Sequence, residues 1–312
     1  MAKRTVRMGE FGLTVEIPER VVDAVRRVRP AREGSAQRFE LHPTPEFELR
    51  SRAPQIEAAR AFAAESASAT VPDADAPDAA ETHPWYHTIE FPDGLVTQGR
   101  YDHRELLAHY GFPDDLHGKR VLDVGSGDGF WAFELERRGG EVTSLDIETF
   151  ADVDLPAAIH DLFVQYPLPL FFRRGFHIAH RRLGSKVKLV NGPIYDLDPE
   201  AVGTFDFVHA GDILLHLRDP ALALQRLHAI TSGECLIADC FDPALDTLGA
   251  GPGLTRYRGG WDDATWWAPA LSTLVQMVSD AGFRDIQVLT TYRLADRSST
   301  EGPWRAVIRA RA

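Results

Sequence analysis

The feature that most constrains this chain is a glycine-rich stretch at residues 123–129, Asp-Val-Gly-Ser-Gly-Asp-Gly. It follows a short apolar segment at residues 120–124 and precedes a helical pattern at residues 130–138, so it predicts a tight turn from a strand into a helix. Glycines let a backbone turn sharply and approach a ligand closely, and the amino end of a helix favours an electron-rich group. The order of these elements predicts an α/β fold with a ligand site at the turn.

The same alternation of strand and helix patterns continues to the end of the chain. Strands are expected at residues 141–147, 186–190, 205–214 and 234–239, and helices at residues 171–183, 220–231 and 265–281. Repeated βαβ units imply a parallel sheet with helices on both faces. The last two strands, at residues 286–292 and 304–309, have no long helix between them and predict a hairpin. We therefore expect a Rossmann-like, mostly parallel seven-stranded sheet with an antiparallel final strand.

Composition divides the chain before this pattern begins. Residues 63–81 are rich in Ala, Asp and Pro and have little to bury, so we predict a flexible linker there. Residues 1–62 form a small N-terminal extension in this interpretation, with a strand at residues 13–17 and a short helix at residues 21–28. We expect the extension to cap the active site or to mediate homodimerisation. The catalytic domain is expected at residues 82–312.

Charge and hydropathy exclude several classes of function. The net charge is −12, which argues against a general nucleic-acid coat because binding to phosphates needs a positive surface. No apolar stretch reaches the roughly 18 residues that span a bilayer, and the amino terminus has no apolar signal core. Cys235 and Cys240 lie in an apolar run and are expected to be reduced, buried thiols. These features predict a cytoplasmic protein without a membrane partner.

Two aspartates strengthen the assignment of the glycine turn to a nucleoside-containing ligand. Asp123 stands just before the turn, and Asp146 ends the second strand, where a ribose lies in a doubly wound fold. The NAD fingerprint spaces its last two glycines by two residues, whereas here one residue separates them. The spacing therefore disfavours NAD as the ligand of this turn.

At the level of families, residues 122–129 resemble motif I of the class I S-adenosylmethionine-dependent methyltransferases, and Asp146-Ile147 resembles their acidic motif. Residues 83–99 and 211–220 are similar to the tRNA wobble-uridine (5-carboxymethoxy/5-methoxyuridine) methyltransferase-like group, and the likeness covers about residues 83–292. Members that use carboxy-S-adenosylmethionine have a tyrosine where this chain has Leu215. Leucine offers no hydrogen bond to a carboxylate, so plain S-adenosylmethionine is the expected cofactor.

The resemblance and the sheet positions together imply a set of cofactor-binding residues. These are Asp123, Gly125, Ser126, Gly127, Asp146, Ile147, Ile194, Tyr195, Gly211 and Tyr86. Asp146 is expected to accept hydrogen bonds from the ribose hydroxyls. Ile194 and Tyr195 either lie along the adenine or serve as a core residue and a surface residue. The segment at residues 85–87 is either a lid over the cofactor or ordinary packing.

His216 and Asp212 are the candidate catalytic residues. Histidine is suited to act as a base near neutral pH, and His216 follows the fourth strand at the edge where α/β active sites form. A packing or capping role for His216 stays open. Asp212, Asp239 and Asp242 lie near the carboxyl edge of the expected sheet and are interpreted as loop carboxylates, with a divalent-metal site as the alternative. We predict no metal site.

The basic side chains are concentrated at residues 173–188. Arg174, His177 and Arg181 share one face of the expected helix, which either meets an anionic substrate or RNA or is a solvated stripe. The sequence as a whole predicts methyl transfer from S-adenosylmethionine to an oxygen or nitrogen of a small metabolite, with nucleic acid disfavoured. The alternatives are a tRNA wobble-uridine modifying enzyme and a cofactor-binding protein without catalysis.

Overall fold

The computed structural model describes residues 3–8, 13–18, 51–68, 73–165, 168–249, 251–297, 299 and 301–312. The chain divides into two compact units, Met1–Arg50 and Ser51–Ala312. In the first unit, β1 (Lys3–Met8) pairs antiparallel with β2 (Leu13–Pro18), at the position of the expected strand. The short helix expected at residues 21–28 lies outside the described residues.

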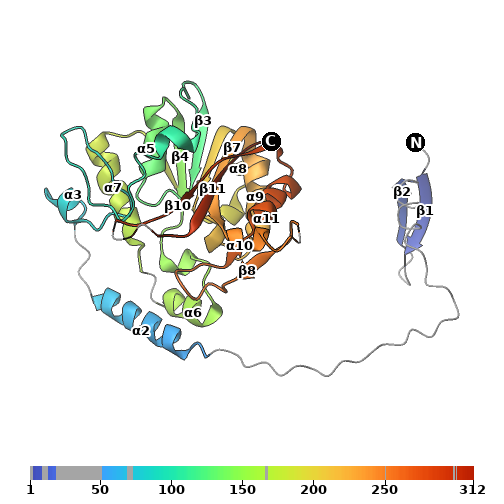
Figure 1. Ribbon diagram of the computed structural model, residues 1–312, viewed down its shortest axis with the longest axis horizontal. Coiled ribbons are helices and arrows are strands. Elements are labelled where there is room, and N and C mark those ends of the chain that lie inside the picture. Colours follow the sequence, from blue (N-terminus) through green and yellow to red (C-terminus); the bar gives the residue numbers. More distant parts are fainter. Residues whose placement is uncertain are drawn as a thin grey trace. The chain divides into compact units, whose positions relative to one another are not determined.

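The second unit is built on a seven-stranded sheet in the order β10-β11-β7-β6-β3-β4-β5 within the described chain (Figure 1). The strands are β3 (Arg120–Val124), β4 (Glu141–Asp146), β5 (Lys188–Asn191), β6 (Phe205–Gly211), β7 (Thr231–Phe241), β10 (Arg284–Arg293) and β11 (Trp304–Arg311). Strands β3 to β7 pair in parallel, and β11 runs antiparallel to β7 and β10. This confirms the predicted mostly parallel Rossmann-like sheet with an antiparallel final strand.

Helices cover both faces of this sheet (Figure 1). The longer helices of the described residues are α2 (Ala53–Ser68), α5 (Phe130–Arg137), α6 (Ala157–Gln165), α7 (Phe171–Leu183), α9 (Pro220–Ile230) and α11 (Leu271–Asp280), of which α2 packs on α6 rather than on the sheet. Shorter elements are α3 (Ala79–Thr82), α4 (Leu107–Tyr110), α8 (Pro199–Val202), α10 (Pro243–Asp246), β8 (Thr255–Tyr257), β9 (Trp267–Pro269), η1 (Phe150–Asp152), η2 (Ile194–Asp196) and η3 (Leu214–His216). The Asp219 side chain caps α9 by accepting from Leu222 N at 2.9 Å.

Successive residues of the central strands point to opposite faces and so build two cores. Val121 packs with Trp131 of α5 and Phe176 of α7 on one face. Leu122 packs with Leu224 of α9 and Leu274 of α11 on the other face. Both faces of β3 are buried, which explains its continuous apolar sequence. The sheet is therefore fixed from both sides, and its carboxyl edge is a rigid support for side chains.

The flexible linker predicted at residues 63–81 is not what the described residues form. Residues 63–68 complete α2, which packs against α6 through Ala63, Ile159 and Phe163. Ala79 and Ala80 are buried in the core beside α7. Alanines can be buried in close helix contacts although each carries little apolar surface, so the composition of these residues does not exclude packed structure.

The helix predicted at residues 265–281 begins later than expected. Residues Trp267–Pro269 form β9, which pairs antiparallel with β8, and α11 begins at Leu271. A proline disfavours the helical conformation of the residue before it, so Pro269 keeps Ala268 extended. No helix among the described residues combines the length and hydropathy needed to span a bilayer.

Candidate active site

The glycine-rich turn joins β3 to α5 at the carboxyl edge of the sheet. Gly125 and Gly127 have φ values of 73° and 58°, a conformation that residues with a side chain rarely adopt. A Cβ at Gly125 would lie 3.1 Å from Ile213 Cδ1, whereas a Cβ at Gly127 would meet nothing within 4 Å. Gly125 is therefore required by close packing as well as by φ, and Gly127 faces open space.

Asp146 ends β4 and ties the turn to the neighbouring strand. Its Oδ2 accepts a hydrogen bond from Gly127 N and its Oδ1 accepts one from Ile147 N, both at 2.8 Å. Burial raises the pKa of Asp146 to about 6, against the attraction of Arg173 and these amide hydrogen bonds. The carboxylate is thus charged at neutral pH but protonates within the mildly acidic range.

Arg173 supplies the positive charge beside Asp146, a role that the sequence did not reveal. Only 5% of the residue is exposed, and its Nη2 donates to Asn191 Oδ1 at 2.5 Å. Its Nη1 is buried and has no hydrogen-bond partner in the described part of the chain. Arg173 therefore faces the sheet edge, unlike Arg174 and Arg181 of the same helix, which bond to Asp73 O and Ala74 O at 3.0 and 2.9 Å.

Asp123 starts a buried hydrogen-bonded chain beneath the turn. Its Oδ1 lies 2.6 Å from His209 Nδ1, and His209 Nε2 lies 2.9 Å from the hydroxyl of Tyr110. All three side chains are buried, and the second carboxylate oxygen, Oδ2, has no hydrogen-bond partner among the described residues. Asp123 is therefore fixed by His209 with one acceptor oxygen still available.

A cavity of about 180 Å³ lies beside the turn. Its walls come from the ends of β3 and β4 and from the segments that follow β3, β4, β5 and β6. They are Val124, Gly125, Leu145, Asp146, Ile147, Asp152, Val153, Asp154, Gly192, Pro193, Ile194, Tyr195, Ile213, His216 and Leu217. Of the predicted site residues, the structure thus brings together Gly125, Asp146, Ile147, Ile194, Tyr195 and His216. The cavity is apolar along one wall and carries carboxylates along another.

Tyr195 lines this cavity as a half-buried side chain held at its hydroxyl. The hydroxyl donates to Asp154 Oδ2 at 2.6 Å and accepts from Asp219 N at 3.1 Å. Burial raises the pKa of Tyr195, and the hydrogen bond to Asp154 raises it further. The ring is therefore neutral and fixed against the cavity.

The other predicted cofactor residues do not line the cavity. Ser126 is buried, and its Oγ is hydrogen-bonded to Ser144 Oγ under the turn. Gly211 ends β6, where a Cβ would come within 2.8 Å of His209 Cε1. These two residues shape the turn and the strand behind it. Tyr86 lies in the segment upstream of the sheet.

That upstream segment is fastened to the glycine turn by Asp128. Its Oδ2 accepts from Tyr86 N at 3.1 Å and from His87 N at 2.7 Å, and its Oδ1 lies 2.5 Å from His87 Nδ1. Asp128 is fully buried, so these bonds are shielded from water. The sequence predicts either a lid or ordinary packing for residues 85–87 and indicates no role for Asp128. Trp85 is buried in the core, as expected of a packing residue.

The candidate catalytic residues occupy different surroundings. His216, in η3, lines the cavity, and its Nδ1 lies 3.3 Å from Ala264 O. Burial lowers the pKa of His216, so the imidazole is neutral at pH 7. Asp212 has a φ of 51° and forms an ion pair with the buried guanidinium of Arg305. The Asp212 carboxylate is therefore occupied by the Arg305 guanidinium.

The three carboxylates considered as metal ligands point to separate partners. Asp239 is buried and accepts from the backbone amides of Leu214, Leu215 and Cys240. Burial raises the pKa of Asp239 to about 7, and the nearby Asp212 carboxylate raises it further. Asp242 caps α10 and pairs with Arg256. Within the described residues, no group of three or more histidine, cysteine or acidic side chains is arranged to hold a metal ion.

A second cavity of about 270 Å³ lies on the other side of η3. Leu214, Leu215, Trp267, Leu274 and Met277 contribute most of its apolar wall. Leu215 and Leu214 point to this cavity, whereas Ile213 and His216 line the first one. The short η3 helix is therefore a partition between the two spaces.

Part of the chain is similar in sequence to known O-methyltransferases. The chain is 32% identical over 125 residues to the magnesium-protoporphyrin O-methyltransferase of Rhodobacter capsulatus, which is 40% of this chain and 45% of that protein. It is 29% identical over 175 residues to the ubiquinone biosynthesis O-methyltransferase of Psychrobacter arcticus, 54% of this chain and 60% of that protein. The chain thus matches less than two thirds of the length of either relative.

Among solved structures, the chain resembles the 1,6-didemethyltoxoflavin-N1-methyltransferase of Burkholderia thailandensis, solved with 1,6-didemethyltoxoflavin and S-adenosylhomocysteine bound. The TM-score is 0.40 and the identity 22%, with 62% of this chain and 71% of that chain covered. Residues 96–288 of this chain, from the upstream segment to β10, match the family described as methyltransferase domain. The match covers more than half of the chain, and the chain belongs to the methyltransferase domain family.

Proposed function

We propose that the chain binds S-adenosylmethionine in the cavity beside the glycine turn and catalyses methyl transfer to an oxygen or nitrogen atom of a small metabolite. The observation that carries the proposal is the Gly127–Asp146 hydrogen bond at the wall of that cavity. It places a buried carboxylate at the carboxyl ends of two adjacent parallel strands, where α/β folds bind their ligands. Family membership and the O-methyltransferase names of the two curated relatives support the reaction class.

The side chains present fit this cofactor. Ile194 and the neutral ring of Tyr195 offer an apolar and an aromatic surface suited to adenine. The Asp146 carboxylate is suited to accept from ribose hydroxyls. The unpartnered Oδ2 of Asp123 is a buried acceptor at the start of the turn and suits the amino group of a methionine moiety. Each part of the cofactor thus has a matching group at one edge of the sheet.

The chemistry that S-adenosylmethionine supplies is an electrophilic methyl group, so the chain contributes mainly positioning and exclusion of water. The Asp128 anchor holds the upstream segment against the glycine turn. His216 is neutral at pH 7 and can take a proton from an acceptor hydroxyl. Asp212, paired with Arg305, orients that guanidinium.

Replacement of Asp146 tests the cofactor proposal. Asp146→Ala is expected to weaken the binding of S-adenosylhomocysteine by about 1.5–3 kcal/mol, because a charge-assisted hydrogen bond is lost. Calorimetry measures the affinity and circular dichroism checks the fold. Asp198→Ala is the matched control, since Asp198 caps α8 and does not line the cavity. An Asp146→Ala variant that is folded and binds with unchanged affinity would contradict the proposal.

The second candidate function is modification of a tRNA wobble uridine, which the similarity at residues 83–99 and 211–220 favours. We propose a small metabolite instead. The net charge of −12 repels a polyanion, and Arg174 and Arg181 already bond to residues 73–75. A mobility-shift titration with total bacterial tRNA distinguishes the two. Micromolar binding at physiological salt that weakens steeply as salt rises would favour the tRNA enzyme.

A cofactor-binding protein without catalysis is the third candidate. It predicts that S-adenosylhomocysteine and S-adenosylmethionine bind but that no acceptor gains mass. Incubation with S-adenosylmethionine and a panel of hydroxylated and nitrogen-containing metabolites, followed by mass spectrometry, tests this outcome. A mass gain of one methylene unit in any member of the panel excludes it.

A further inference from the structure

A second group of polar side chains gathers at the carboxyl edge of the sheet, near the ends of β6 and β10 and the start of β11. We call it the tyrosine cluster; its members are Tyr86, Tyr101, His103, Asp212, Tyr292 and Arg305. Ring centroids are 5.0 Å apart for Tyr86 and Tyr101, 6.1 Å for Tyr101 and His103, and 6.4 Å for His103 and Tyr292. None of these side chains lines the cavity assigned to the cofactor.

The Asp212–Arg305 ion pair belongs to the same cluster because its charges act on the tyrosines. Burial raises the pKa of Tyr86 and of Tyr292; the Asp212 carboxylate raises both further, and the Arg305 guanidinium opposes it. Both phenols therefore stay protonated at neutral pH and can donate hydrogen bonds. The ion pair itself contributes no net charge.

The hydrogen-bonding capacity of the cluster is largely unused. The hydroxyls of Tyr86, Tyr101 and Tyr292, on half-buried side chains, bond to none of the described residues. His103 is 95% buried, and both of its ring nitrogens lack a partner among the described residues. Burial lowers the pKa of His103 to about 3, so the ring is neutral and offers one donor and one acceptor. Buried polar groups without partners are rare in folded proteins, so these groups are candidates to bond a ligand.

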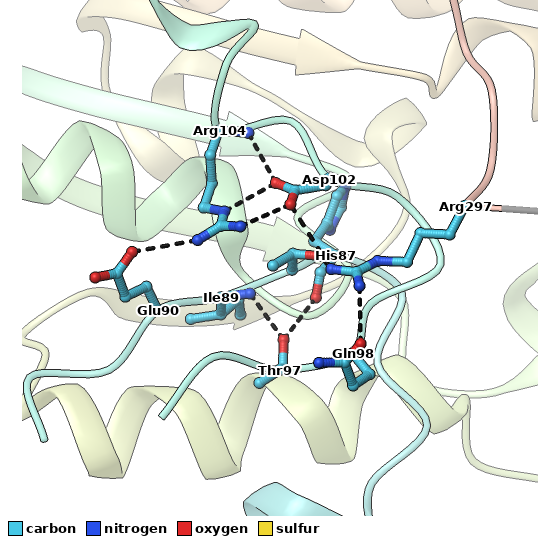
Figure 2. Close-up of polar contacts among 9 residues, drawn as sticks. His87, Ile89, Glu90, Thr97, Gln98, Asp102, Arg104 and Arg297 are labelled. Atoms are coloured by element: carbon cyan, nitrogen blue, oxygen red, sulfur yellow. Dashed lines mark hydrogen bonds and ion pairs between the residues drawn. The ribbon is translucent and has the colours of Figure 1, made fainter. Parts of the chain in front are cut away.

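The segments that carry the cluster are fixed relative to one another (Figure 2). Arg297, in the loop after β10, donates to Gln98 Oε1 and to Thr88 Oγ1, both at 2.8 Å. Its Nη2 also lies 3.7 Å from Asp102 Oδ2, and the same oxygen accepts a hydrogen bond from Arg104 Nη2 at 2.8 Å. These contacts hold the chain that bears Tyr86, Tyr101 and His103 against the β10 end that bears Tyr292. Asp128 in turn fastens Tyr86 to the glycine turn.

We propose that the tyrosine cluster binds the methyl acceptor and that the acceptor is a neutral, hydroxylated aromatic ring. This inference rests on the proposed function, because the cluster adjoins the turn assigned to the cofactor. The absence of net charge in the cluster favours a neutral ligand. Rings crossing edge to face, such as Tyr86 and Tyr101 at 66°, suit another aromatic ring. The cluster's single carboxylate, the strong acceptor that the hydroxyls of a sugar would use, already binds Arg305, which favours an aromatic ring over a sugar.

Probe binding tests the proposal on the full chain saturated with S-adenosylhomocysteine. Calorimetric titration compares catechol with cyclohexane-1,2-diol, which keeps both hydroxyls but has no aromatic ring, and with D-glucose. We expect catechol to bind about fivefold to tenfold more tightly than either of the other probes. Tyr292→Leu is expected to weaken catechol binding about tenfold, and Tyr292→Phe, which keeps the ring, about threefold. Tyr257→Leu is the matched control, because the Tyr257 ring is exposed on β8.

The outcomes separate this inference from the proposed function. Equal binding of catechol and cyclohexane-1,2-diol, tighter binding of glucose, or unchanged catechol binding in both Tyr292 variants would overturn it. If S-adenosylhomocysteine binds and catechol does not, only the acceptor assignment fails. If S-adenosylhomocysteine does not bind, the proposed function fails, and catechol titrated alone still decides whether the cluster holds an aromatic ring. Circular dichroism melts verify folding, and Tyr292→Phe decides the hydroxyl's part if Tyr292→Leu does not fold.

Discussion

The two halves of the sheet's carboxyl edge satisfy their polar side chains in different ways. On the β3–β4 side, Asp146 bonds to backbone amides of Gly127 and Ile147, close by in the chain. On the β6–β11 side, Asp212 pairs with Arg305, 93 residues away, and Arg297 bonds to Thr88 across 209 residues. A site that is assembled locally survives as a sequence motif. A site assembled over such distances leaves no local pattern.

Removal of Arg305 is expected to have the largest effect, on the long-range half. Arg305→Met leaves Asp212 without its counter-charge and removes the cation that opposes the raised pKa of Asp239. We expect the free energy of unfolding to fall by about 3–5 kcal/mol at pH 8, because a buried charge pair loses one partner. Urea unfolding measures the change. The loss should be smaller at pH 6, where Asp239, with a pKa of about 7, is protonated.

The double variant Arg305→Met/Asp212→Asn provides the control. Asn tolerates the positive φ of position 212 and removes the uncompensated charge, so at least half of the lost stability should return. A single variant as stable as the wild type would show that the two halves do not differ in this way.

The fold could be predicted from the sequence because its signals are local. The seven strands and the antiparallel final strand follow from apolar segments separated by helical patterns. The expected helix at residues 171–183 coincides with α7. Two predictions were wrong: the flexible linker at residues 63–81 and the start of the helix at residue 265. The burial of alanines decides the structure in the first region, and Pro269 decides it in the second. The first depends on tertiary contacts and the second on a single residue, and hydrophobic periodicity reports neither.

The candidate site could be predicted only in part for the same reason. Gly125, Asp146, Ile194 and Tyr195 do line one cavity, since they follow the ends of adjacent strands. No pattern near Arg305 indicates that it pairs with Asp212, and no pattern near Tyr292 places it beside His103. Such contacts depend on how β10 and β11 fold back onto the sheet.

Replacement of His216 tests whether this residue acts as a base in methyl transfer or contributes to cofactor binding. If His216 acts as a base, His216→Ala should lower turnover by about 10²-fold or more while the affinity for S-adenosylhomocysteine changes less than threefold. If His216 instead contributes to cofactor binding as part of the cavity wall, the affinity for S-adenosylhomocysteine should fall, and turnover at saturating cofactor should not. Calorimetry and methyl transfer to the acceptor found by mass spectrometry measure the two effects. A loss confined to affinity would assign His216 to the cofactor half.

The pH dependence of cofactor binding sharpens the comparison further. Burial raises the pKa of Asp146 to about 6, so the carboxylate is charged at pH 7.5 and largely protonated at pH 5. We expect the affinity for S-adenosylhomocysteine to fall by up to about tenfold between these pH values, because the protonated group is a poorer acceptor. Calorimetry at pH 5, 6, 7 and 7.5 measures the change. Asp146→Asn should bind with an affinity independent of pH, and a parallel pH response in that variant would place the titrating group elsewhere.

The smallest effect is expected at the exposed face of α7, where Arg181 pairs with Asp75. Their side chains are 52% and 69% exposed, so water and salt screen the attraction, and Arg181→Ala should lower the free energy of unfolding by at most about 0.5 kcal/mol. Arg173→Met, on the buried face of the same helix, is the contrasting variant. It removes the charge beside Asp146 and should weaken binding of S-adenosylhomocysteine severalfold, whereas Arg181→Ala should leave that affinity unchanged. Urea unfolding and calorimetry on both variants provide the comparison. A decrease in the free energy of unfolding above about 1.5 kcal/mol in Arg181→Ala would contradict this expectation. It would mean that the packing of residues 73–82 against α7 depends on the exposed face of that helix.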